Sequence, residues 1–151
     1  MSAFELVRRT HVAADPARVH DLINDFRKWP AWSPWEGLDP AMQRDYSGSD
    51  AGVGSHYAWS GNRKAGRGST EITDSNPQEV GIDLHFDKPF KADNRIVFEL
   101  TPAEGGTDVA WTMRGEQTGL SGLFGKLFNM DRLVGGDFEK GLARLKTAAE
   151  S

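Results

Sequence analysis

The sequence predicts a single α+β domain over residues 1–151, in which a curved antiparallel sheet of about seven strands wraps around a long C-terminal helix. Three patterns lead to this fold class. A short amphipathic helix follows the first strand, alternating segments separated by short turns fill the middle of the chain, and apolar residues near the end recur at helical spacing. No repeat, linker or low-complexity tract divides the chain.

Composition limits the classes of function. The chain has 151 residues, 38% hydrophobic and 26% charged, which is typical of one globular domain with its own core. The net charge of −4 argues against nucleic acid or an anionic membrane as the main partner. Without cysteine there is no disulfide, thiolate nucleophile or cysteine-ligated metal. No segment resembles a signal peptide or a membrane span, so a cytoplasmic location is expected.

The first strand is expected over 4–12, where β-forming residues alternate loosely. A helix should follow, because Asp15 offers an N-cap acceptor and Pro16 suits the first helical position. Its apolar face is formed by Val19, Leu22, Ile23 and Phe26. The helix should end near Trp29, since Pro30 disfavours helical geometry in the residue before it.

Six further strands are expected after this helix, each bounded by glycine, asparagine or proline turns. Their ranges are 41–47, 55–60, 66–74, 80–87, 95–101 and 108–115. The short gaps between them favour antiparallel hairpins. Alternation gives the resulting sheet one apolar face, and the final helix is the only element large enough to cover it.

The final segment is expected to form a short helix over 120–128 and a longer one over 131–149. Gly135, Gly136 and Gly141 fall inside the pattern, and each costs about 1 kcal/mol of helix stability relative to alanine. The helix therefore either breaks near these glycines or lies with its backbone close to the sheet. Its charges mix both signs, which is typical of a solvated face.

Three tryptophans separated by prolines lie between the first helix and the sheet: Trp29, Trp32 and Trp35. Such a run fits neither a helix interior nor a central strand. We expect Trp32 and Trp35 to pack inward near the rim of a pocket, and Trp29 to close the first helix against the core. The alternative is that all three only seal the open end of the sheet.

A sheet that grips a helix leaves space in which small ligands commonly bind. The candidate ligand-binding residues are Trp32, Trp35, Tyr57, Trp59, Leu84, Phe86, Phe98, Trp111, Met113, Leu127, Val134 and Phe138. The alternative for most of them is plain core. Burial of one such side chain is worth about 1.5–3 kcal/mol with or without a ligand, so energetics alone does not separate the two.

No catalytic residue, cofactor or metal ligand is predicted. The histidines, His11, His20, His56 and His85, lack metal-ligand spacing, and the last two are expected to face solvent. Alternation also directs the charged strand residues away from the cavity: Glu71, Asp83, Asp87, Glu99 and Arg114. Asp25 and Arg27 could reach the pocket mouth.

Several motifs occur in a characteristic order: 15–19, 25–35, 59–61 followed by 66–68, 106–111 and 136–146. Together they resemble the SRPBCC superfamily of START-related helix-grip proteins, in particular its polyketide cyclase/dehydrase-type branch. The resemblance implies a helix-grip fold. It also implies a hydrophobic or aromatic small molecule, of lipid-, quinone- or polyketide-like type, bound between the sheet and the C-terminal helix. No catalytic residue carries over.

Binding is the favoured function because few ionisable groups are expected inside the cavity. One alternative is a polyketide cyclase or dehydratase in which Tyr57 or Asp25 transfers protons. Another is a protein-interaction or co-chaperone-like module that uses the tryptophan run. The expected partner is a hydrophobic small molecule and not nucleic acid, and the expected assembly is a monomer or weak homodimer.

Overall fold

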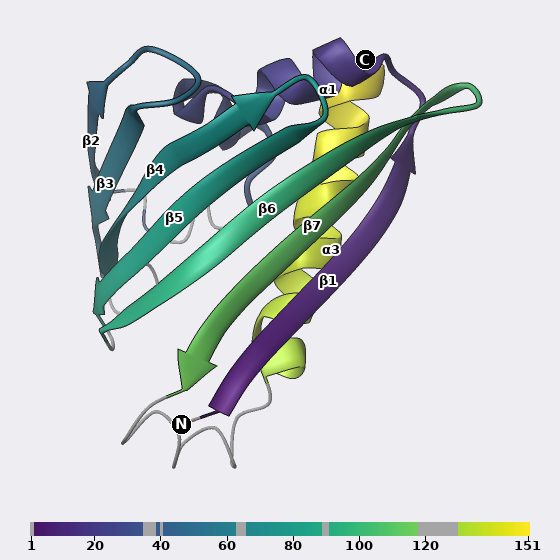
Figure 1. Cartoon of the computed structure of the whole chain (residues 1–151). Coiled ribbons are helices and arrows are strands. Elements are labelled where there is room, and N and C mark those ends of the chain that lie inside the picture. Colours follow the sequence, from purple (N-terminus) through teal and green to yellow (C-terminus); the bar gives the residue numbers. More distant parts are fainter. Residues whose placement is uncertain (1, 35–38, 40, 63–65, 89–90, 118–129) are drawn as a thin grey trace.

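The computed structural model describes residues 2–34, 39, 41–62, 66–88, 91–117 and 130–151. Its elements are β1 (Ser2–Val12), α1 (Pro16–Ile23), the 3₁₀ helix η1 (Phe26–Ala31), β2 (Gln43–Gly48), β3 (Ser55–Ser60), β4 (Arg67–Asn76), β5 (Glu79–Lys88), β6 (Ala92–Ala103), β7 (Gly106–Gln117) and α3 (Met130–Glu150). The seven strands form one antiparallel sheet in the order β1-β7-β6-β5-β4-β3-β2. The sheet curves around α3, and α1 lies near the C-terminal end of that helix (Figure 1). The predicted fold class is confirmed.

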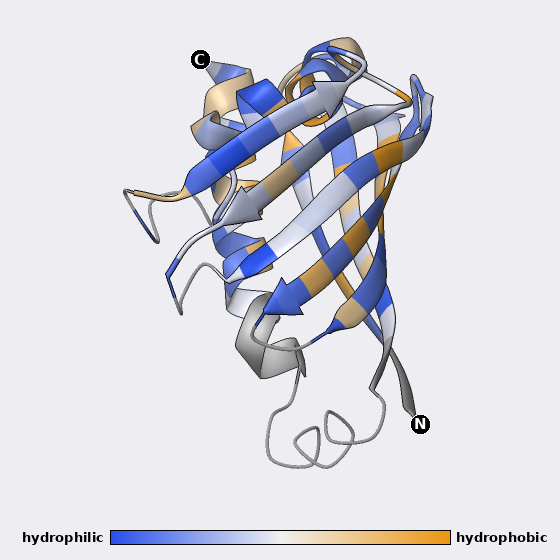
Figure 2. Cartoon of the chain, turned by 90° about the vertical axis from the view of Figure 1, so that its left-hand side faces the viewer, coloured by the Kyte–Doolittle hydropathy of each residue, from blue (hydrophilic) through white to orange (hydrophobic). Residues whose placement is uncertain are grey.

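The register of the strands builds the core by bringing apolar residues into rows on the concave face. One such row crosses five strands and is buried throughout: Ile72, Ile82, Ile96, Met113 and Leu6. Figure 2 shows hydrophobic and hydrophilic residues alternating along the strands, as expected when one face meets the core. The predicted strands occur in the predicted order; β3 has the predicted bounds, β2 is one residue shorter, and the other five are longer than expected, β6 and β7 most of all.

The first helix is shorter than the sequence predicts. It ends at Ile23 rather than near Trp29, and the separate 3₁₀ helix η1 follows with Pro30 inside it. The break has a local cause: Asp25 is extended, and its carboxylate accepts a hydrogen bond from the Arg27 amide at 2.9 Å. An aspartate side chain that accepts a hydrogen bond from the backbone amide two residues further on favours a new turn over continuation of the α-helix. Asp15 occupies the expected N-cap position of α1 without a side-chain cap bond.

Helix α3 runs without interruption through its glycines, and its buried residues fall on one face: Phe138, Leu142, Leu145 and Ala149. A Cβ atom on Gly135 would lie 2.4 Å from Nη2 of Arg8, and one on Gly141 would lie 2.9 Å from Cζ3 of Trp111. These two glycines thus let the helix backbone approach the sheet closely. Of the two alternatives that the sequence left open, a break in the helix or a close approach to the sheet, the second is the one found. The helix predicted over 120–128 falls outside the described residues. Within those residues no helix is both long and apolar enough to cross a membrane.

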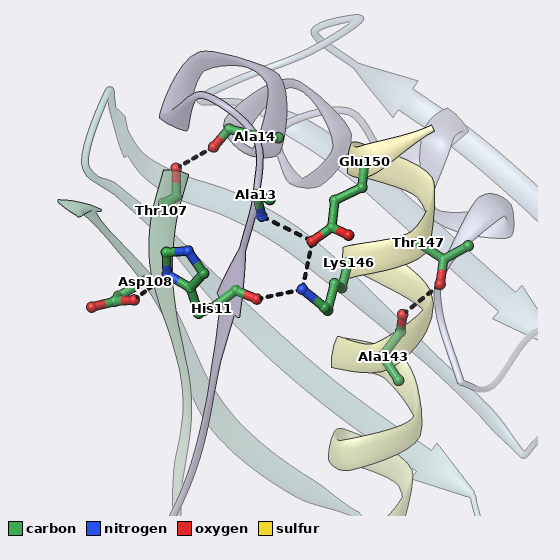
Figure 3. A network of polar contacts seen from close by, with 9 residues as sticks. All are labelled: His11, Ala13, Ala14, Thr107, Asp108, Ala143, Lys146, Thr147 and Glu150. Carbon is green, nitrogen blue, oxygen red and sulfur yellow. Dashed lines mark hydrogen bonds and ion pairs between the residues drawn. The ribbon is translucent and has the colours of Figure 1, made fainter. Parts of the chain in front are cut away.

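The C-terminal end of α3 is tied to the end of β1 and the residues that follow it (Figure 3). Lys146 donates a hydrogen bond to the His11 carbonyl at 3.0 Å, and Glu150 accepts one from the Ala13 amide at 2.8 Å. Lys146, followed by the Ala13 amide, lowers the pKa of the Glu150 carboxyl. Arg18 of α1 donates to the Ala149 carbonyl at 2.6 Å, where a cation also complements the helix dipole. The charged face of α3 is therefore not wholly solvated, in contrast to the sequence-based expectation.

Candidate ligand-binding site

Four aromatic rings fill the concave side where β6 and β7 face α3. Trp32, Phe98, Trp111 and Phe138 have no exposed surface, and we call them the ring core. The rings of Trp111 and Phe138 stack with centroids 4.0 Å apart, and Phe98 lies 4.8 Å from Trp111. Trp32 packs edge-on against Phe98 and Trp111 at 5.8 and 5.7 Å. In this part of the fold the space between sheet and helix is occupied by side chains.

The described part of the tryptophan run closes α1 onto this core. The indole N–H groups of Trp29 and Trp32 donate to the carbonyls of Ile23 and Leu22 at 2.8 and 2.9 Å. These carbonyls belong to the last turn of α1, where carbonyl groups have no hydrogen-bond partner within the helix. Trp32 thus lies in the core rather than at a rim, and Trp29 closes the first helix as predicted. Trp35 lies outside the described residues.

Arg144 fixes the same segment to α3. Its guanidinium donates to the Ser33 carbonyl at 3.1 Å, and Pro34 packs against Gly141. A hydrogen bond and an apolar contact therefore hold residues 33–34 on the helix. This segment acts as a seal between α1, the ring core and α3.

A second group of aromatic residues continues from the ring core across β2, β3 and β5. Tyr46, Tyr57, Trp59 and Phe86 are only partly buried, and we call them the aromatic strip. Their rings follow one another at 5.0 Å (Tyr46–Tyr57), 6.0 Å (Tyr57–Trp59) and 5.6 Å (Trp59–Phe86). Phe26 links the strip to Trp29, since its ring centroid lies 6.1 Å from that of Tyr57 and 5.2 Å from that of Trp29. The strip thus combines aromatic surface with access to solvent.

Gly68 of β4 makes the strip continuous. It pairs with Trp59 on one side and Phe86 on the other, next to a shift in the strand register. A Cβ atom at this position would lie 2.7 Å from Cη2 of Trp59 and 2.3 Å from the His85 carbonyl oxygen. Only glycine therefore lets the Trp59 ring lie across β4 and meet Phe86 edge-on.

The remaining sequence-predicted site residues divide into two groups. Leu84 and Met113 are buried on the same concave face, with 8% and 4% of their surface exposed. Leu127 and the side chain of Val134 lie outside the described residues. Six of the twelve candidates are therefore buried, and three, Tyr57, Trp59 and Phe86, are partly exposed.

Charged groups lie mostly on the convex face, as alternation predicts. Glu71, Asp83 and Arg95 form one convex row across β4, β5 and β6, and Arg95 donates to Asp83 at 2.9 Å. Sequence reasoning missed Arg8, which pairs with Trp111 on the concave side and lies 4.0 Å from Glu139. The signal was present, since Arg8 alternates in phase with the core residue Leu6.

The two groups expected at the pocket mouth behave differently. The carboxylate of Asp25 is used in starting η1. The guanidinium of Arg27 lies over the ring of Tyr46, 5.1 Å from its centroid, in a cation–π arrangement. Arg27 therefore reaches the edge of the aromatic strip, and Asp25 has a structural role.

A family comparison covers almost the whole of this fold. Residues 3–150 match the model of a family described as polyketide cyclase / dehydrase and lipid transport. The chain belongs to this family. The search of curated proteins found no match to this chain. The description of the polyketide cyclase/dehydrase family names several activities and does not specify which one this member has.

Several solved structures have the same fold as this protein, although their sequence identity to it is low. The solution structure of KanY protein aligns with a TM-score of 0.70 and 16% identity, over 100% of both chains. The Aha1 dimer from Colwellia psychrerythraea aligns at 0.68 and 18%, over 97% of this chain and 96% of that one. The crystal structure of Ara h 8.0201 aligns with a TM-score of 0.63 and 12% identity, over 98% of both chains. At such identities the likeness shows the helix-grip fold alone.

Among the described residues, no group of three or more histidine and carboxylate side chains could hold a metal ion. His85 lies exposed on the convex face, as expected, where Nδ1 contacts Asp93 and Nε2 lies 3.2 Å from Asp87. The hydrogen bond that His85 donates to Asp93, with the charges of both carboxylates, raises the pKa of His85 above 6.5. The imidazolium thus links β5 to β6 at the solvent surface of this polyketide cyclase/dehydrase family protein.

His85 should make stability depend on pH. Because its folded-state pKa is raised, its contribution is fully present below the unfolded value of 6.5 and is lost as the pH rises through the folded value. We expect a contribution below about 1 kcal/mol, since solvent screens exposed pairs. Urea unfolding of the wild type and His85→Gln, at about pH 5 and about pH 9, measures it. Equal pH dependence in both proteins would show that the pair contributes nothing.

Proposed function

We propose that this protein binds a hydrophobic or aromatic small molecule, of lipid-, quinone- or polyketide-like type, against the aromatic strip on the concave face of the sheet. One observation carries the proposal: the strip leaves four neighbouring aromatic rings partly exposed, whereas the ring core is fully buried. Contiguous exposed aromatic surface on a concave face is typical of a ligand site. Family membership supports the same function.

The two aromatic groups have different roles in this proposal. The rings of the ring core contact one another at 4.0–5.8 Å, so a ligand that entered there would have to displace them. The strip offers ring faces that a flat ligand can cover without such displacement. The ring core then serves as the fixed back wall, and Tyr57, Trp59 and Phe86 provide the contact surface.

The rival functions have less support in the described residues. Of the two candidates for proton transfer, only Tyr57 lies in the strip, because Asp25 starts η1. The tryptophans 29 and 32 direct their N–H groups to α1, which fits a seal better than a docking surface for another protein. A cyclase or dehydratase remains an outcome that the binding experiment can detect.

Replacing Trp59 by leucine should weaken ligand binding about tenfold, since an aromatic contact worth about 1–1.5 kcal/mol is lost. The probes are a long-chain fatty acid, a naphthoquinone and a hydroxylated anthraquinone. Native mass spectrometry and tryptophan fluorescence measure their binding. Val53→Ser is the matched control, because Val53 is apolar, 56% exposed and outside the strip.

Three results would decide the proposal. Binding by the wild type and by Val53→Ser, but weaker binding by Trp59→Leu, supports it. No binding of any probe, or equal binding by Trp59→Leu and the wild type, contradicts it. A product of changed mass after incubation with a poly-β-keto substrate would favour the enzyme instead.

A further inference from the structure

Two polar side chains interrupt the apolar concave face directly beside the strip. Thr70 of β4 pairs with Tyr57 on one side and with Leu84 on the other, and Asn94 of β6 pairs with Leu84. Thr70, Leu84 and Asn94 thus form one row across three neighbouring strands. The adjacent row on the same face contains Trp59, Gly68 and Phe86. A ligand that covers the strip therefore lies within reach of both polar groups.

Neither polar group is used by the described part of the chain. The Thr70 hydroxyl and the Asn94 amide make no hydrogen bond to another described residue, although Thr70 is only 6% exposed and Asn94 is partly buried. Two other buried hydroxyls are hydrogen-bonded: Ser55 donates to the Ser49 carbonyl and Thr107 to the Ala14 carbonyl, each at 2.8 Å. Groups left open on a concave face are available to water or a ligand.

Thr112 shows what a purely structural threonine looks like. It is 5% exposed, as buried as Thr70, and likewise bonds no other described side chain or carbonyl through its hydroxyl. Thr112 lies on the convex face, however, paired with Val7 and Val97 and away from the strip. Placement on the strip side, rather than burial alone, therefore distinguishes Thr70.

The chemistry of the row selects for uncharged oxygen. A hydroxyl and a carboxamide offer both donors and acceptors but no charge, so they match a carbonyl or hydroxyl group rather than a carboxylate. Thr70 and Asn94 lie two strand spacings apart, about 9.5 Å, on either side of Leu84. An apolar ring seated on Leu84 would thus have hydrogen-bonding groups at both of its edges.

We infer that Thr70 and Asn94 determine ligand specificity, and that they select an uncharged fused-ring compound bearing a hydroxyl or carbonyl oxygen over the bare hydrocarbon of the same shape. This inference rests on the proposed function. The inference adds an orientation of the ligand to the proposed function, because the ligand oxygen must point to the row of Thr70, Leu84 and Asn94 while its ring faces the strip.

The test compares naphthalene with naphthol and naphthoquinone, which share one ring system and differ in oxygen. We expect the wild type to bind each oxygenated probe about tenfold more tightly than naphthalene, as measured by tryptophan fluorescence and calorimetry. Thr70→Val and Asn94→Leu should each reduce this preference severalfold while naphthalene affinity stays within about twofold. Thr112→Val, the same change on the opposite face, should retain the preference.

The outcomes separate the inference from the proposed function. If all three probes bind the wild type equally, or if both variants keep the full preference, the inference is wrong while ligand binding stands. If the wild type binds none of them, and none of the earlier panel, the proposed function fails and the inference fails with it. Thr70→Val is nearly isosteric and keeps the test decisive if Asn94→Leu does not fold.

Discussion

Replacing Trp32 by alanine is expected to lower the free energy of unfolding by about 3–5 kcal/mol, the range for a fully buried tryptophan. The ring has no exposed surface and contacts Trp29, Phe98 and Trp111, and the variant also loses the hydrogen bond from its Nε1 to the Leu22 carbonyl. Urea unfolding against the wild type at one pH measures the loss.

Trp59→Leu is the natural comparison, because Trp59 is also an aromatic residue of the concave face but only partly buried. It should lose much less stability than Trp32→Ala and much more ligand affinity. If Trp32→Ala kept its stability, the assignment of this tryptophan to the core would be wrong. If instead it folded stably but no longer bound ligand, the tryptophan run would belong to the pocket rim.

The glycines of α3 should respond in opposite directions to alanine. A Cβ atom on Gly141 would lie 2.8 Å from Cδ of Pro34 and 2.9 Å from Cζ3 of Trp111, both parts of rigid rings. Overpacking of this kind costs about 1–3 kcal/mol, against about 1 kcal/mol gained in helix propensity. We therefore expect Gly141→Ala to lower stability and to raise the rate of unfolding.

Gly136→Ala is the matched control, since no other heavy atom lies within 4 Å of the added Cβ. Gly136 is exposed on the same helix, so this variant should gain about 0.5–1 kcal/mol. Thermal unfolding of the two variants and the wild type is sufficient. A gain in stability from Gly141→Ala would show that the helix does not lie as close to the sheet as described.

Most of the fold follows from local patterns. Alternation and the bounding turn residues together located the strands, and the spacing of Phe138, Leu142 and Leu145 identified the final helix. The end of α1 was missed, since the competition between the Asp25 side chain and the helix backbone has no period in the sequence. The sequence did not show whether the helix breaks at Gly135 and Gly141 or packs closely on the sheet there, because helix propensity carries no information about neighbours distant in sequence.

The candidate site was less predictable than the fold. Alternation tells which face of a strand a residue occupies but not how far the covering helix extends, so Trp111 and Trp59 looked alike in the sequence. The structure separates them, with Trp111 fully buried and Trp59 partly exposed. Gly68 acquires its role only through two cross-strand partners, and that pairing depends on a register shift no local pattern reveals.

The pairing of β1 with β7 has a consequence for synthesis. Residues 2–12 find their strand partner only at 107–117, and Arg18 and the Ala13 amide find theirs at Ala149 and Glu150. Contacts so distant in sequence slow folding, because a long loop must close before they form. During translation the first strand must therefore remain an unpaired sheet edge until the seventh emerges from the ribosome. Nascent chains stalled before residue 107 should accordingly be good substrates for chaperones that bind extended apolar segments.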